Sequence, residues 1–269
     1  MALATWVVSS SAYAADETLY FYSPEFGPSN LSVLTQAVDT FFDDAGLDVQ
    51  FQPFARLEDF RRKIDTHPPT FLIAPEWAAR SECFDEQLTA IVQPTRSGLT
   101  SGRRALMAGP SVQSAQQIAN GSVAAAVAKA GSDLEDISMG HFRADYPTVN
   151  IIPVPKDIDA LLAVGFGQVD AAFVSLAQFK MLERVNPNLT ANLHEIGYSQ
   201  KSPFPRLYAT ARATNEASDM IAAAFGKIRD ASGRHMFSIL GFDDAKILTG
   251  ADKTVIKARS GCSFGGGGK

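Results

Sequence analysis

The sequence predicts an α/β fold of two lobes, each built on a mostly parallel sheet flanked by helices. Short apolar runs typical of buried strands alternate with segments of helical periodicity along most of the chain. The length of 269 residues suffices for one large domain or two small ones. Apolar residues make up 46% of the chain and charged residues 20%, as in ordinary soluble globular proteins.

The first part of the chain predicts a β-α-β-α-β unit, which begins a parallel, doubly wound sheet. The expected strands are residues 18–22, 49–54 and 70–74. Between the first two strands, Leu31, Leu34, Val38 and Phe41 recur at helical spacing. A second helix follows the second strand and must end at the Pro68-Pro69 pair.

The second part repeats this alternation. The expected strands are residues 105–108, 122–128, 149–154, 169–174 and 206–210. The alanines of 122–128 would also suit a helix. The expected helices are residues 112–118, 176–185, 216–230 and 232–240. A further helix is expected to begin at Asp157, which caps it, and to end at Gly165 or Gly167. We expect crossings near 96–104 and 195–203, which assigns 15–100 and 200–258 to lobe 1 and 101–199 to lobe 2.

The N-terminus resembles an export signal. Residues 2–8 are apolar, and Ala12-Tyr13-Ala14 precedes the charged Asp16-Glu17, a pattern that signal peptidase cleaves. We therefore expect residues 1–14 to be part of a signal peptide and the mature protein to be periplasmic. The alternative is a buried N-terminal strand. Because no Lys or Arg precedes the apolar run, we expect the native start to lie upstream.

Cys83 and Cys262 are the only two cysteines. They could form a disulfide in an oxidising compartment, and two free thiols are the alternative. Residues 259–269 form a glycine-rich tail that we expect to be disordered. The tail contains a G-x-S-x-G match at 261–265, but it lacks the flanking strand, helix and downstream His that a serine nucleophile needs.

Several classes of function are excluded. A formal net charge of -5 removes the general attraction to phosphate backbones, so we expect no nucleic-acid partner. No run approaches the roughly 18 apolar residues that span a bilayer. The four histidines are scattered singly, and neither a Walker A motif nor G-x-G-x-x-G occurs. We therefore expect no metal, no cofactor and no enzymatic activity.

Polar residues gather where the predicted strands end. In open α/β sheets, ligands bind outside the carboxyl ends of strands, and helix N-termini donate N–H groups to them. The candidate ligand-binding residues are Tyr22, Ser23, Trp77, Lys129, Ser132 and Ser175. The alternative is that these are ordinary caps and turns. Glu25 and Glu76 argue against a purely anionic ligand unless they point away.

Residues 154–175 carry a recognisable pattern. A helix containing Ala160-Leu161 and ending at Gly167-Gln168 leads into a strand that begins Val169-Asp170-Ala171-Ala172. This stretch resembles the phosphate/phosphite/phosphonate group of ABC-transporter solute-binding proteins. Supporting stretches are residues 94–98, 103–106 and 203–205.

The resemblance implies a periplasmic-binding-protein-like fold of type II that closes over a small oxyanion such as phosphate, phosphite or a phosphonate. It also implies a monomer that delivers the anion to a membrane permease. Family members hold the anion on a turn rich in Ser and Thr. The corresponding turn here, residues 128–133, has one serine, Ser132, and one lysine, Lys129, where the family pattern has several hydroxyl groups. Tyr22, Trp77 and Ser175 match other family positions. The alternative function is a sensory or partner-binding module that retains the fold without transport.

Overall fold

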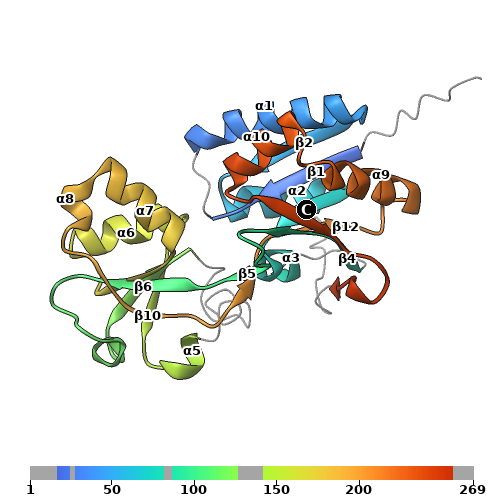
Figure 1. The fold of residues 1–269 in the computed structure, drawn as a ribbon. Helices are drawn as coiled ribbons and strands as arrows, with labels where there is room; N and C mark the ends of the chain where they lie inside the picture. The colour runs from blue at the N-terminus through green and yellow to red at the C-terminus, as the bar shows by residue number, and fades with distance from the viewer. Residues whose placement is uncertain (1–16, 25–27, 82–86, 127–141, 257–269) are drawn as a thin grey trace, which may run out of the picture.

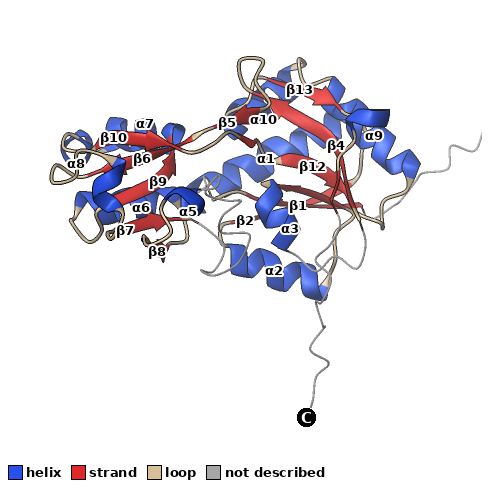
Figure 2. Ribbon diagram, turned by 90° about the horizontal axis from the view of Figure 1, so that it is seen from below, coloured by secondary structure: helices blue, strands red, loops and turns tan. Residues whose placement is uncertain are grey.

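The chain folds into two sheets, each covered by helices. The computed structural model describes residues 17–24, 28–81, 87–126 and 142–256. Figure 2 shows the two sheets as separate groups of strands. We call the larger sheet with its helices lobe 1 and the smaller sheet with its helices lobe 2.

Lobe 1 contains a seven-stranded mixed sheet in the order β13-β4-β12-β3-β1-β2, with β14 also paired to β4. β1, β2 and β3 run parallel, and the other strands pair antiparallel. The strands are β1 (Glu17–Tyr22), β2 (Val49–Phe54), β3 (Phe71–Ala74), β4 (Leu88–Thr95), β12 (Arg206–Ala209), β13 (Asp244–Ile247) and β14 (Val255–Ile256). The helices are α1 (Pro28–Ala45), α2 (Leu57–Thr66), α3 (Glu76–Ser81), α9 (Asn215–Gly226), α10 (Ala231–Leu240) and the 3₁₀ turn η2 (Gly250–Asp252).

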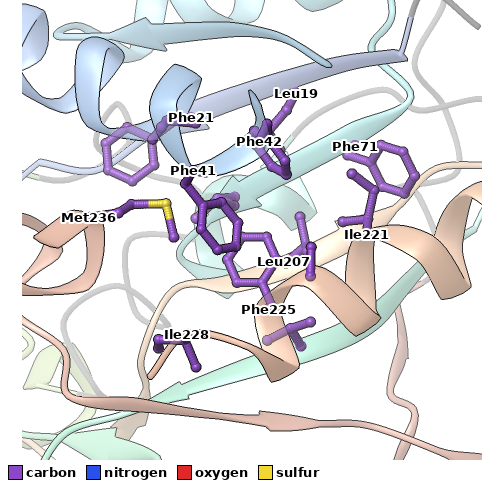
Figure 3. Packing of buried hydrophobic residues seen from close by; sticks show 14 of the residues in the cluster. Leu19, Phe21, Phe41, Phe42, Phe71, Leu207, Ile221, Phe225, Ile228 and Met236 are labelled. Carbon is purple, nitrogen blue, oxygen red and sulfur yellow. The ribbon is translucent and has the colours of Figure 1, made fainter. Parts of the chain in front are cut away.

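The alternation of side chains along β1 divides the lobe 1 core into two layers. Leu19 and Phe21 pack with α1, α9 and α10 on one face of the sheet. Tyr20 and Tyr22 pack with α2 and α3 on the other face. The strand is thus buried on both sides, which explains its continuous apolar and aromatic sequence. Figure 3 shows aromatic rings of the first layer in contact, including those of Phe41 and Phe225.

Lobe 2 contains a five-stranded mixed sheet in the order β10-β6-β9-β7-β8. The strands are β6 (Arg104–Ala108), β7 (Ser122–Ala125), β8 (Asn150–Pro153), β9 (Ala171–Ser175) and β10 (His194–Tyr198). The helices are η1 (Ala115–Ile118), a 3₁₀ turn, with α5 (Phe142–Asp145), α6 (Asp157–Gly165), α7 (Leu176–Val185) and α8 (Pro187–Thr190). One face of the sheet packs with η1 and α5, and the other packs with α6 and α7.

The two crossings between the lobes pair with each other. β5 (Ser101–Gly102) and β11 (Ser202–Pro203) form a two-stranded antiparallel sheet, and Figure 1 shows β5 between the two larger sheets. We call this pair the hinge. A Cβ atom on Gly102 would lie 2.8 Å from Cε1 of Phe204, so any larger residue there would have to displace this ring.

The predicted two-lobe α/β fold is confirmed, but the sheets are mixed and not mostly parallel. The difference arises because β12 returns from lobe 2 and enters the lobe 1 sheet antiparallel to both β3 and β4. In lobe 2, β6 likewise pairs antiparallel with β9 and β10. The predicted helix at 112–118 is only the 3₁₀ turn η1, and the ambiguous segment at 122–128 begins with strand β7.

Some predictions lie outside the described residues. These are the signal peptide at 1–14, the glycine-rich tail at 259–269, and both cysteines, Cys83 and Cys262. Within the described ranges, no helix is both long and apolar enough to cross a bilayer.

We predict that Phe225→Ala lowers the free energy of unfolding by about 3–5 kcal/mol, because it opens a cavity in a close-packed core. Phe225 is 2% exposed, and its ring contacts those of Phe41, Phe42 and Phe237. Urea unfolding followed by circular dichroism measures the change. The control is Phe166→Ala, which alters a side chain that is 66% exposed and should change stability by less than about 0.5 kcal/mol. Equal effects of the two changes would contradict the described packing.

Candidate ligand-binding cleft

A cleft of about 450 Å³ lies between the lobes. Its lining comes from the end of β1, the start of α3, the start of α7 and both crossings. The lobes also touch beside it, where the backbone N–H of Asp157 in lobe 2 donates to the carbonyl of Pro24 in lobe 1 at 3.5 Å. A ligand in this cleft would contact both lobes and the hinge.

Three of the residues predicted from the sequence line this cleft together. They are Ser23 after β1, Trp77 in the first turn of α3, and Ser175 at the end of β9. Each follows or closes a strand, as the rule for open α/β sheets predicts. Whether they contact a ligand stays a prediction.

The other three residues predicted from the sequence are not among the described residues that line the cleft. Tyr22 is 2% exposed and lies in the lobe 1 core, where its ring meets the Trp77 indole edge-on at 6.1 Å and stacks on Phe60 at 5.4 Å. It therefore supports the wall that Trp77 forms. Lys129 and Ser132 lie outside the described residues.

Four positively charged residues, which the motif analysis did not select as ligand contacts, line the cleft. They are Arg96, Arg103, Arg104 and Lys201. All four belong to the crossings or to the residues next to them. The only sequence signal was the inclusion of the arginines in two stretches that supported the family resemblance. Nothing local marked Lys201.

A buried ion pair holds Arg104 in place. Its Nη2 donates to Oδ1 of Asp157, whose side chain is fully buried, and to the carbonyl of Phe173 at 2.9 Å. The other carboxylate oxygen of Asp157 accepts from the backbone N–H of Ser175 at 2.8 Å. The prediction that Asp157 caps its own helix is wrong, because Lys156 occupies the cap position. The buried carboxylate instead takes charge-assisted bonds from its neighbours.

The N-terminus of α7 faces the cleft. The hydroxyl of Ser175 caps this helix by accepting from the backbone N–H of Gln178 at 3.3 Å. The next two residues, Leu176 and Ala177, line the cleft. Their backbone N–H groups belong to the first turn, where the helix dipole places partial positive charge. This end of the helix is suited to a negatively charged group.

Glu76 is the one carboxylate among the described lining residues, and its charge is compensated. One oxygen accepts from Arg80 Nε at 2.9 Å and Nη2 at 2.7 Å, and the other lies 3.5 Å from Nη1 of Arg206. Arg206 in turn donates from Nε to Gln93 at 2.6 Å. Burial raises the pKa of nearby Tyr208 far above its ordinary value, so this phenol stays neutral. Glu76 therefore does not oppose an anion as the sequence suggested.

Arg96 is fixed by contacts within lobe 1 and the hinge. Its Nε donates to the carbonyl of Gly241 at 2.6 Å. Its guanidinium lies over the rings of Phe204 and Phe242, with centroid distances of 5.1 and 5.3 Å. Cation–π contacts of this kind hold the group in one orientation without neutralising its charge.

We predict that Asp157→Asn lowers the free energy of unfolding by about 3–5 kcal/mol, because it leaves the largely buried guanidinium of Arg104 without a counter-charge. Thermal or urea unfolding measures the loss. Asp159→Asn is the matched control in the same helical turn, and there only the interaction with the helix dipole changes, by less than about 1 kcal/mol. An Asp157→Asn protein as stable as this control would show that the pair is not structurally important.

No family model and no curated protein matches the sequence. Several solved structures are similar to it in fold. The binding protein component of an ABC phosphonate transporter from Pseudomonas aeruginosa is 14% identical, with a TM-score of 0.66 over 86% of this chain and 80% of that chain. PhnD1 from Prochlorococcus marinus, in complex with methylphosphonate, is 12% identical, with a TM-score of 0.67 over 91% of this chain and 93% of that chain.

A histidine kinase sensor domain with similarity to periplasmic binding proteins is 16% identical. Its TM-score is 0.55, and the match covers 84% of this chain and 94% of that chain. These likenesses concern the fold. The chain has the two-lobe α/β fold of type II periplasmic binding proteins, which confirms the fold that the sequence resemblance implied.

Proposed function

We propose that this protein is the periplasmic solute-binding component of an ABC transporter and that it binds a small oxyanion between its lobes. Phosphate, phosphite and phosphonates are the candidate ligands. The observation that carries the proposal is the charge of the cleft in a protein of formal net charge -5: four cationic side chains line it, and only Arg104 among them has a carboxylate partner in the described residues. A positive cleft in an acidic protein concentrates anions locally.

The start of α7 provides a second contribution to anion binding. Its first-turn N–H groups carry partial positive charge, and Arg104 lies beside them because Asp157 holds both Arg104 and the N–H of Ser175. These donors are fixed before a ligand arrives, which lowers the entropy cost of binding. Trp77 and Pro75 add an apolar wall on the lobe 1 side, which suits an organic substituent such as the alkyl group of a phosphonate.

The solved structures of similar fold are consistent with this function. Two of them are described as a phosphonate transporter component and as a methylphosphonate complex. In a transporter of this class, the receptor closes over its ligand and then docks on a membrane permease. We expect the present chain to act as a monomer in that role.

A second candidate function is a sensory module that retains the fold without transport. The observation that favours it is the likeness to a histidine kinase sensor domain, at a TM-score of 0.55. Genes for a permease and an ATPase beside the gene for this protein would favour transport, and a gene for a membrane kinase there would favour sensing.

We predict that one phosphorus oxyanion raises the midpoint of thermal unfolding selectively and saturably, because a ligand of the folded state stabilises it by mass action. At one hundred times the dissociation constant, the gain is about 2.7 kcal/mol. The measurement is a thermal-shift panel on the full chain with phosphate, phosphite, methylphosphonate, sulfate and amino acids. A shift with amino acids alone, or with none of these compounds, would contradict oxyanion binding.

A further inference from the structure

Two of the cleft cations flank the hinge. Arg103 follows β5, Lys201 precedes β11, and both line the cleft. Gly102 pairs with Ser202, and the next backbone bond joins the N–H of Ser199 to the carbonyl of Arg104 at 2.9 Å. Arg103 therefore lies opposite a two-residue bulge that includes Lys201. One positive charge from each crossing thus lines the cleft, on adjacent segments.

Neither charge forms an ion pair within the described ranges of the chain, and Arg103 acts electrostatically on the phenol of Tyr198, which donates to Glu195. The ion pairs found there involve other cations. Both Arg103 and Lys201 are exposed. Like charges on adjacent segments repel each other. The hinge thus carries a repulsion that an anion bound between the two side chains would relieve.

The remaining cleft cations are already engaged. Arg104 is neutralised by Asp157, and Arg96 is held by the Gly241 carbonyl and two aromatic rings. Arg103 and Lys201 are therefore the groups best able to reorganise around a ligand. Two adjacent cations without a carboxylate between them match a group that carries two negative charges better than a group that carries one.

We propose that Arg103 and Lys201 form a hinge anchor for a doubly charged oxyanion and that this anchor determines the preference for dianions over monoanions. The inference rests on the proposed function, because it places the anionic ligand in the same cleft. Beyond that function, the inference names the residues that select the ligand and the charge state of the ligand that they select. Because each crossing supplies one cation, the bound dianion links the two crossings and stabilises their pairing.

The experiment compares two probes by isothermal titration calorimetry at mildly alkaline pH and low ionic strength. Methylphosphonate carries two negative charges there, whereas its monomethyl ester carries one on a similar phosphorus centre. The wild-type protein should bind methylphosphonate about tenfold or more tightly than the ester. Arg103→Gln and Lys201→Met should each weaken methylphosphonate binding by about tenfold and ester binding by only about threefold, because the Coulomb energy is proportional to the charge of the anion.

The matched control is Arg184→Gln. Arg184 is an exposed cation in the last turn of α7, outside the cleft lining, and its removal changes the net charge by the same amount. This variant should bind both probes as the wild type does. A second readout needs no ligand. At low salt, Arg103→Gln and Lys201→Met should each unfold at a higher temperature than Arg184→Gln, because they relieve the repulsion at the hinge.

The outcomes separate the two proposals. If the wild-type protein binds methylphosphonate but the Arg103 and Lys201 variants bind it equally well, the hinge anchor is wrong and the proposed function stands. Equal affinity of the wild type for the ester and for methylphosphonate leads to the same conclusion. If the wild type binds neither of these probes nor inorganic phosphate, the proposed function fails, and the anchor fails with it.

Discussion

The buried ion pair between Arg104 and Asp157 organises the region where the two lobes meet. Arg104 is the first residue of β6 and pairs in register with Ser175, the last residue of β9. Asp157 is the first residue of α6 and binds both Arg104 and the backbone N–H of Ser175. One carboxylate therefore fixes the start of β6, the start of α6 and the junction between β9 and α7. Removing either partner would leave a charge in a site with little access to water.

This arrangement determines what the cleft offers to a ligand. Asp157 neutralises Arg104, and Arg80 with Arg206 compensates Glu76, whereas Arg96 keeps its charge on the lobe 1 wall. Further positive charge lies beside the hinge, on Arg103 and Lys201. Charge at a hinge has a mechanical consequence, because an anion bound there acts on both crossings at once. If an anion binds at the hinge as we propose, its charge couples ligand binding to the relative position of the lobes.

The sequence predicted the elements whose signals are local. β1 and β3 are short apolar runs, and α7 has clear helical periodicity between Ser175 and a proline. The place of Ser23, Trp77 and Ser175 in the cleft lining could be predicted because all three lie at or just after strand ends. Tyr22 met the same rule, but the alternation along β1 directs it into the core beside Phe60.

The remaining features depend on contacts between distant segments. The antiparallel entry of β12 follows from where the chain returns after lobe 2, which no local pattern encodes. Asp157 has the sequence context of a helix cap, and only the fold places it beside Arg104. Lys201 becomes part of the cleft because β11 pairs with β5, although their sequences contain no complementary signal.

The central claim is that an oxyanion binds between the lobes, against the hinge and the start of α7. Titration of ¹⁵N-labelled protein with methylphosphonate, followed by amide chemical shifts, tests this location directly. We expect the largest changes at the amides of Gly102, Arg103, Lys201, Leu176 and Ala177. Saturable changes confined to other surfaces, with these five amides unmoved, would contradict it.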